Sequence, residues 1–230
     1  MIIELVASRM VAPEIGVSLY TWTSVIGVIL AGMSLGNYLG GRLADWRASP
    51  RFLGLILLLC SLASLTILAM ASWLQGSTIP VGFPLVAWVI LYIAAMFFVP
   101  SLLLGCVSPM VVKLSLTDLQ KTGTTVGKIY AWSTAGSIAG TFATGFLLVS
   151  WFGTRTVILM VAGVLLLMAI WFLTETTRRA AAMGAGAAML IFAGSVALLD
   201  GQEALASNCL YESSYYCIKV TDLEGTDGRV

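Results

Sequence analysis

GMSLGNYLGG, residues 32–41, places glycines four positions apart at Gly32, Gly36 and Gly40, inside a long apolar run. A spacing of four is close to the 3.6 residues of a helical turn, so these glycines line one face of a helix. A phosphate-binding loop would follow a strand and continue with Lys and Ser or Thr, whereas Gly41 is followed by arginine and leucine. The stretch therefore predicts a membrane helix whose small residues let a neighbouring backbone approach closely.

The composition of the whole chain also places it in a lipid bilayer. Hydrophobic residues make up 59% of the 230 residues and charged residues only 10%, against about 25% charged in soluble domains. A net charge of +1 without a clustered basic face gives no support for a nucleic-acid partner. The chain has no histidine, the commonest general base and neutral metal ligand. We assign no catalytic, cofactor-binding or metal-binding residue.

Apolar runs long enough to cross the bilayer predict the fold. A hydrocarbon core of about 30 Å takes about 20 helical residues. Six such runs are predicted as spans, at residues 18–39, 52–73, 85–106, 126–150, 156–174 and 180–199. Residues 1–11 are apolar too, but they reach only about 16 Å as a helix and are expected to be half of one. The predicted fold is an all-α integral membrane bundle over residues 1–199.

A second pair of glycines has the same helical spacing. Gly136 and Gly140 lie among other small residues in the predicted span 126–150. We expect them to form another close helix contact. The sequence leaves open whether the two glycine faces pack against each other.

Lysine and arginine residues predict the orientation of the bundle. Eight of them should share one face, namely Arg42, Arg47, Arg51, Lys113, Lys121, Lys128, Arg178 and Arg179. The opposite face has only Arg9 and Arg155 before the tail. Cationic loops are translocated poorly, so the face with eight cations is expected to be cytoplasmic. Six spans then place the tail after residue 199 outside.

The tail has a different character from the bundle. Residues 209–220, CLYESSYYCIKV, contain aromatic and branched residues in short runs around a Ser-Ser bend, which predicts two β-strands. A strand pair alone is marginal in water. We therefore expect residues 200–230 to begin a soluble domain that continues beyond Val230, and the chain to be truncated at both ends.

Three side chains are candidates for a functional role. Glu4 lies in an apolar segment, where ionisable groups are often functional, but a position near an interface is an equal alternative. Cys209 and Cys217 flank the predicted bend. They could form a disulfide in an oxidising compartment, or remain two reduced strand residues.

Two features at the predicted cytoplasmic face have local explanations. Asp45 is expected near Arg42 or Arg47, as a surface ion pair at the end of a helix. Residues 108–116 begin with Ser-Pro and are expected to form a short helix along the membrane surface.

Several motifs together resemble one family. They are ELVASRMVAPEIGVSLYTW from residue 4, GNYLGGRLAD from residue 36, SPM from residue 108 and GKIYAWSTAGSIAGT from residue 127. In this order they resemble the membrane part of bacterial proteins in which a multi-span domain is fused to a spermidine synthase-like domain. The tail sequence YESSYYCIKV, residues 211–220, resembles the opening strands of that synthase fold. Residues 36–51 are also similar to the loop after the second helix of major facilitator transporters.

The resemblance implies a multi-pass protein of the bacterial inner membrane with a role related to polyamine synthesis. Aminopropyltransferases move an aminopropyl group from decarboxylated S-adenosylmethionine to putrescine. Their glycine-rich nucleotide motif and acidic amine-binding residues do not occur before Val230, so this chain alone is expected to be inactive. The implied partners are the lipid bilayer, the synthase-like domain and a polyamine or related substrate.

Three functions stay open at this point: a membrane anchor for a synthase-like enzyme, a major facilitator-like carrier, and a scaffold without chemistry. A substrate made in the cytoplasm would favour a cytoplasmic tail, in conflict with the distribution of charge. We expect an external tail, because the bias of eight cations against two is observed directly in this sequence.

Overall fold

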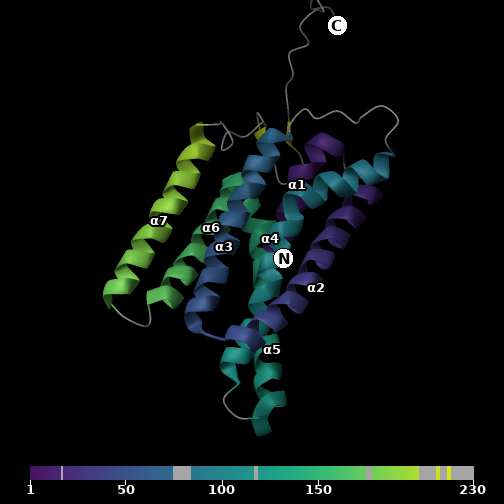
Figure 1. Ribbon diagram of the computed structural model, residues 1–230. Helices are drawn as coiled ribbons and strands as arrows, with labels where there is room; N and C mark the ends of the chain where they lie inside the picture. Colours follow the sequence, from purple (N-terminus) through teal and green to yellow (C-terminus); the bar gives the residue numbers. More distant parts are fainter. Residues whose placement is uncertain are drawn as a thin grey trace, which may run out of the picture.

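The computed structural model describes residues 1–16, 18–74, 84–116, 119–174, 178–201, 211–212 and 217–218. Helices dominate these residues (Figure 1). They are α1 (Ile2–Ile15), α2 (Leu19–Arg47), α3 (Pro50–Trp73), α4 (Leu85–Ser115), the 3₁₀ turn η1 (Leu119–Lys121), α5 (Thr122–Ala143), the π-helical turn η2 (Thr144–Leu148), α6 (Val149–Thr174) and α7 (Arg178–Gly201).

Serine caps fix the starts of α2 and α3. The Ser18 hydroxyl accepts a hydrogen bond from the Thr21 backbone N–H at 3.2 Å, and the Ser49 hydroxyl accepts one from Phe52 at the same distance. Such caps satisfy backbone donors that have no partner inside the helix. Pro50 follows at the first position of α3, where a missing N–H costs nothing. The chain can therefore reverse direction in the two residues between α2 and α3.

Four helical runs are long and apolar enough to cross a membrane: Leu19–Arg47, Pro50–Trp73, Leu85–Ser115 and Thr122–Thr174. The chain is thus a helical membrane protein, but the prediction of six full spans is not supported. The predicted spans 126–150 and 156–174 fall in one run of 53 residues. This run is not one continuous helix, because the backbone of Gly153 inside it is non-helical. The predicted sixth span lies within α7, where Met189–Leu198 is identified as a shorter apolar helix among the described residues.

The run of 53 residues bends sharply at Gly153. This residue has φ 74° and ψ 163°, a backbone conformation that is essentially restricted to glycine. The π-helical turn η2 lies just before the bend and links α5 to α6. The bend lets α5 and α6 take different directions although few residues separate them.

The helices form two closely packed groups. α2 lies against α4, while α3 lies against α6 and α7 (Figure 1). α3 also contacts α4 and thereby joins the groups. α1 packs against α2 and α6, and its Val6, Ala7 and Val11 are completely buried. With 14 residues, α1 is too short to cross a membrane.

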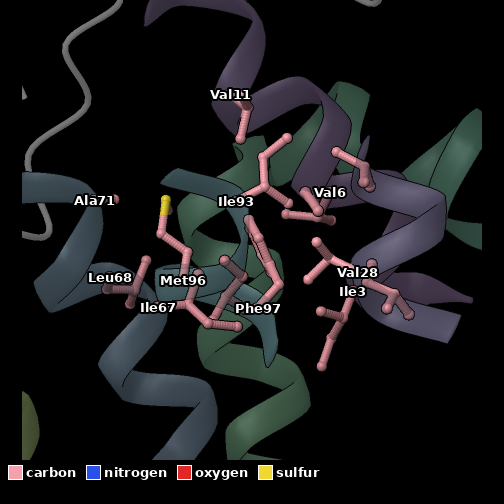
Figure 2. Packing of buried hydrophobic residues seen from close by; sticks show 14 of the residues in the cluster. Ile3, Val6, Val11, Val28, Ile67, Leu68, Ala71, Ile93, Met96 and Phe97 are labelled. Carbon is pink, nitrogen blue, oxygen red and sulfur yellow. The ribbon is translucent and has the colours of Figure 1, made fainter. Parts of the chain in front are cut away.

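Large apolar side chains fill the middle of the bundle. Figure 2 shows Phe97, Met96 and Ile93 of α4 lying against Ile67 and Leu68 of α3, with α1 above them. Each of these five side chains is at most 2% exposed. Apolar side chains in a membrane gain little free energy when they move from contact with lipid to contact with another helix. The helices are therefore held together by the van der Waals contacts of these closely packed side chains.

The predicted C-terminal β segment is not supported as a domain. The structure describes two strands of two residues each, β1 (Tyr211–Glu212) and β2 (Cys217–Ile218), which pair antiparallel with Tyr211 opposite Ile218. The rest of the predicted segment, including Cys209, lies outside the described residues. So short a pair has no independent stability.

We expect Gly153→Ala to destabilise the protein by about 1–3 kcal/mol, because alanine adopts this backbone conformation only with strain. Gly163→Ala is the matched control, since Gly163 lies within α6 and an added methyl group meets nothing within 4 Å. Thermal unfolding in detergent should show a lower midpoint for Gly153→Ala and an unchanged or higher one for Gly163→Ala. Equal midpoints would mean that the bend imposes no strain.

Candidate functional site

The glycines of residues 32–41 lie where α2 meets α4. A methyl group added at Gly32 would sit 2.9 Å from the Ser101 Cβ, and one at Gly40 would sit 2.6 Å from the Cys106 Cα. At Gly36 it would overlap the carbonyl oxygen of Leu102. These approaches are shorter than side chains permit. The two backbones are therefore in direct contact over two helical turns, and only glycine fits at these positions of α2.

The partner face on α4 contributes a glycine of its own. A methyl group on Gly105 would lie 2.7 Å from the carbonyl oxygen of Met33. Higher residue numbers on α2 meet higher numbers on α4, so the two helices run parallel. Gly105 was not singled out by the sequence analysis, because it is the one glycine of the predicted span 85–106.

An ion pair joins α2 and α4 at the end of their contact. The Lys113 ammonium donates a hydrogen bond to the Asp45 carboxylate at 2.9 Å. The expectation of a pair with Arg42 or Arg47 is wrong, because Asp45 reaches across to α4, and the Arg42 guanidinium lies 5.5 Å from the centre of the Tyr38 ring. The side chains of Lys113 and Asp45 are 49% and 75% exposed, so the pair contributes at most about 1 kcal/mol.

A pocket of ≈ 420 Å³ lies beside the ion pair. It is bounded by the last turns of α2 and α4 and by the first turns of α5. Its lining combines polar and apolar residues: Asn37, Gly41, Ala44, Asp45, Ser108, Pro109, Val112, Lys113, Leu116, Val126 and Tyr130. The expected surface helix 108–116 does not exist separately. α4 continues to Ser115 with Pro109 inside it, and its last turns form a wall of the pocket.

The second glycine pair does not form a comparable contact. A methyl group at Gly136 would meet nothing within 4 Å, and one at Gly140 would lie 3.3 Å from the side chain of Ile2 on α1. The expectation of close helix packing at Gly136 is therefore wrong, and Gly140 closely approaches a flexible side chain and not a backbone. The two glycine pairs do not pack against each other, since the first faces α4.

Two features of the contact between α3 and α6 were missed by the sequence analysis. The Ser61 hydroxyl donates a buried hydrogen bond of 2.7 Å to the carbonyl oxygen of Ala162. Gly54 also lies in this interface, where a methyl group would sit 3.1 Å from the carbonyl oxygen of Ala169. A lone serine or glycine in an apolar span gives no signal in the sequence. Together they allow α3 and α6 to pack closely.

The remaining candidate residues are placed apart from the pocket. Glu4 is half-buried in the first turn of α1, where the positive end of the helix dipole favours a carboxylate. A functional role for Glu4 stays a prediction. Cys60 and Cys106 are buried free thiols. The predicted pairing of Cys209 with Cys217 falls outside the described residues, because only the backbone of Cys217 is described in β2.

The residues that the structure describes contain no group of three His, Cys, Asp or Glu side chains that could hold a metal ion. No family model, curated protein or solved structure matches the chain. The geometry itself therefore has to indicate the function. In the described residues it offers a buried apolar cluster, a glycine-packed helix pair, and a pocket with polar groups at one end of that pair.

We expect Gly36→Ala to destabilise the protein by about 1–3 kcal/mol, because the methyl group would force the α2 and α4 backbones apart. Gly27→Ala is the matched control in the same helix, since its methyl group would meet nothing within 4 Å. Unfolding by heat or denaturant in detergent should separate the two variants. If Gly36→Ala is as stable as Gly27→Ala, the close contact does not stabilise the bundle.

Proposed function

We propose that this chain is the membrane anchor of a spermidine synthase-like fusion protein. Residues 1–199 would hold the protein in the bacterial inner membrane, and residues 200–230 would lead into a soluble transferase domain. The proposal joins the family resemblance of the motifs to the packing of the bundle. No catalytic residue is assigned in this chain.

The packed apolar side chains in the middle of the described bundle are the observation that favours an anchor. A carrier needs a path through its middle, and such paths are commonly marked by ionisable side chains. Here the middle is occupied by Phe97, Ile93 and Met96 of α4 against α3 (Figure 2). Polar side chains buried in the described bundle are serines and threonines such as Ser61 and Thr144, whose hydroxyls bond backbone carbonyls.

A carrier-like role is the second candidate, favoured by the pocket at the end of α2 and α4. Part of its lining, Asn37, Gly41, Ala44 and Asp45, lies in the stretch that is similar to the loop after the second helix of major facilitator transporters. Its ion pair joins two helices through exposed side chains, and such a contact can open at little cost. Polyamine uptake into proteoliposomes distinguishes the two functions, because an anchor gives no uptake above that of empty vesicles.

We also propose that the tail lies outside the cytoplasm. In Figure 1 the end of α7 lies at the upper end of the bundle, while the turn between α2 and α3, the end of α4 and the start of α5 lie at the lower end. The lower end has most of the lysine and arginine residues that define the predicted cytoplasmic face. This arrangement supports the charge argument for the orientation.

Reporter fusions after Val230 test both the anchor and the orientation. An alkaline phosphatase fusion should be active, and a green fluorescent protein fusion should not fluoresce. The physical reason is that phosphatase folds only in an oxidising compartment. The phosphatase fusion should also stay in the membrane fraction after carbonate washing. A fluorescent fusion with inactive phosphatase would place the tail inside, and release by carbonate would refute the anchor.

The chain alone should not convert putrescine and decarboxylated S-adenosylmethionine into spermidine, because no catalytic residue has been identified in it. Mass spectrometry of polyamines after incubation with purified protein checks this expectation. Product above that of a preparation from cells with an empty vector would contradict the assignment of residues 1–230 to the non-catalytic part.

A further inference from the structure

The pocket beside Asp45 and Lys113 combines two kinds of surface. Polar groups come from Asn37, Asp45, Lys113 and Tyr130, and apolar groups come from the same helices, including Val112. A ligand that fills it should have a polar part next to a hydrocarbon part. Its volume of ≈ 420 Å³ is in the range of small-molecule sites.

The surroundings of the pocket are strongly cationic. In residues 42–51 and 113–130 of the sequence, six side chains are cationic and two are anionic. The cations are Arg42, Arg47, Arg51, Lys113, Lys121 and Lys128, and the carboxylates are those of Asp45 and Asp118. The field at this end of the bundle therefore favours an anionic ligand.

Aromatic residues place the pocket at the level of the lipid headgroups. Trp46 is 76% exposed, Tyr38 61% and Tyr130 58%. Tryptophan and tyrosine gather at the boundary between hydrocarbon and water, where an apolar ring and a polar group are both satisfied. The apolar stretches of α2 and α4 lie on one side of these residues, and the cationic ends lie on the other.

We propose that this pocket binds the phosphate group of an anionic phospholipid, with Lys113 as the principal cation. The acyl chain would run along the apolar lining near Val112, and the Asn37 amide and Tyr130 hydroxyl are further hydrogen-bond donors within the lining. Basic pockets between membrane helices bind such headgroups because the phosphate is already concentrated at this depth.

The ion pair sets the occupancy of the lipid site. Asp45 holds the Lys113 ammonium at 2.9 Å and competes with the phosphate for it. Both side chains are largely exposed, so water screens their attraction and the pair can be exchanged for a phosphate. The site depends on the membrane placement of the bundle and not on its role as an anchor for a synthase-like domain.

The test measures lipid retention by the purified 230-residue chain. Protein in mild detergent is incubated with an equimolar mixture of phosphatidylglycerol and phosphatidylcholine, and bound lipid is counted by native mass spectrometry. Lys113→Gln should retain about fivefold less phosphatidylglycerol than the wild type, the effect of one cation at a lipid surface. Asp45→Asn should retain more, because it frees Lys113. Lys121→Gln is the matched control, a cation of the same face outside the pocket lining.

Opposite effects of Lys113→Gln and Asp45→Asn support the site, because damage to the fold would lower retention in both variants. Equal retention of phosphatidylglycerol in Lys113→Gln and Lys121→Gln would overturn it, as would equal binding of phosphatidylcholine to the wild type. Displacement of the lipid by millimolar inorganic phosphate would assign the pocket to a free anion and overturn the lipid assignment. Uptake and reporter assays are independent of these outcomes, so the anchor can fail while the lipid site stands.

Discussion

The direct contact between the α2 and α4 backbones is the constraint on which the rest of the bundle depends. In a bilayer, apolar surface gains little by leaving lipid, so helices associate through close packing of small residues. Gly36 and Gly105 provide that packing from opposite sides of the same contact. Because α2 and α4 approach so closely, their ends also meet, and this brings Asp45 to Lys113 and creates the pocket.

Helix content and the glycine face of α2 could be predicted from the sequence, but the partner helix could not. Periodicity shows which residues share a face; it does not show which helix lies opposite. The predicted partners of Asp45 were its sequence neighbours, whereas Lys113 is 68 residues away. The same limit hid Ser61, whose acceptor is a backbone carbonyl that any residue could supply.

The errors in the predicted spans have a different origin. Hydropathy marks where apolar residues stop, but it does not show how two neighbouring apolar runs are joined. Here the non-helical backbone of Gly153, with its positive φ, changes the direction of the chain between the two predicted spans. The glycine spacing at Gly136 led to a wrong expectation for a simpler reason. Small residues are common in membrane helices, and a helix face made of small residues forms a close contact only where another helix lies against it.

The parallel arrangement of α2 and α4 also restricts how the protein can be made. Antiparallel helices can pair as soon as a short turn joins them, whereas parallel neighbours must wait until the chain has crossed back. A nascent chain emerges from its N-terminus, so α2 enters the membrane well before its partner. During that interval lipid or the insertion machinery can lie against the face of α2 that contains Gly36 and Gly40. The close contact between α2 and α4 is consequently among the later ones to form, and a chain whose synthesis stops within α3 would have no α4 to pack against this face.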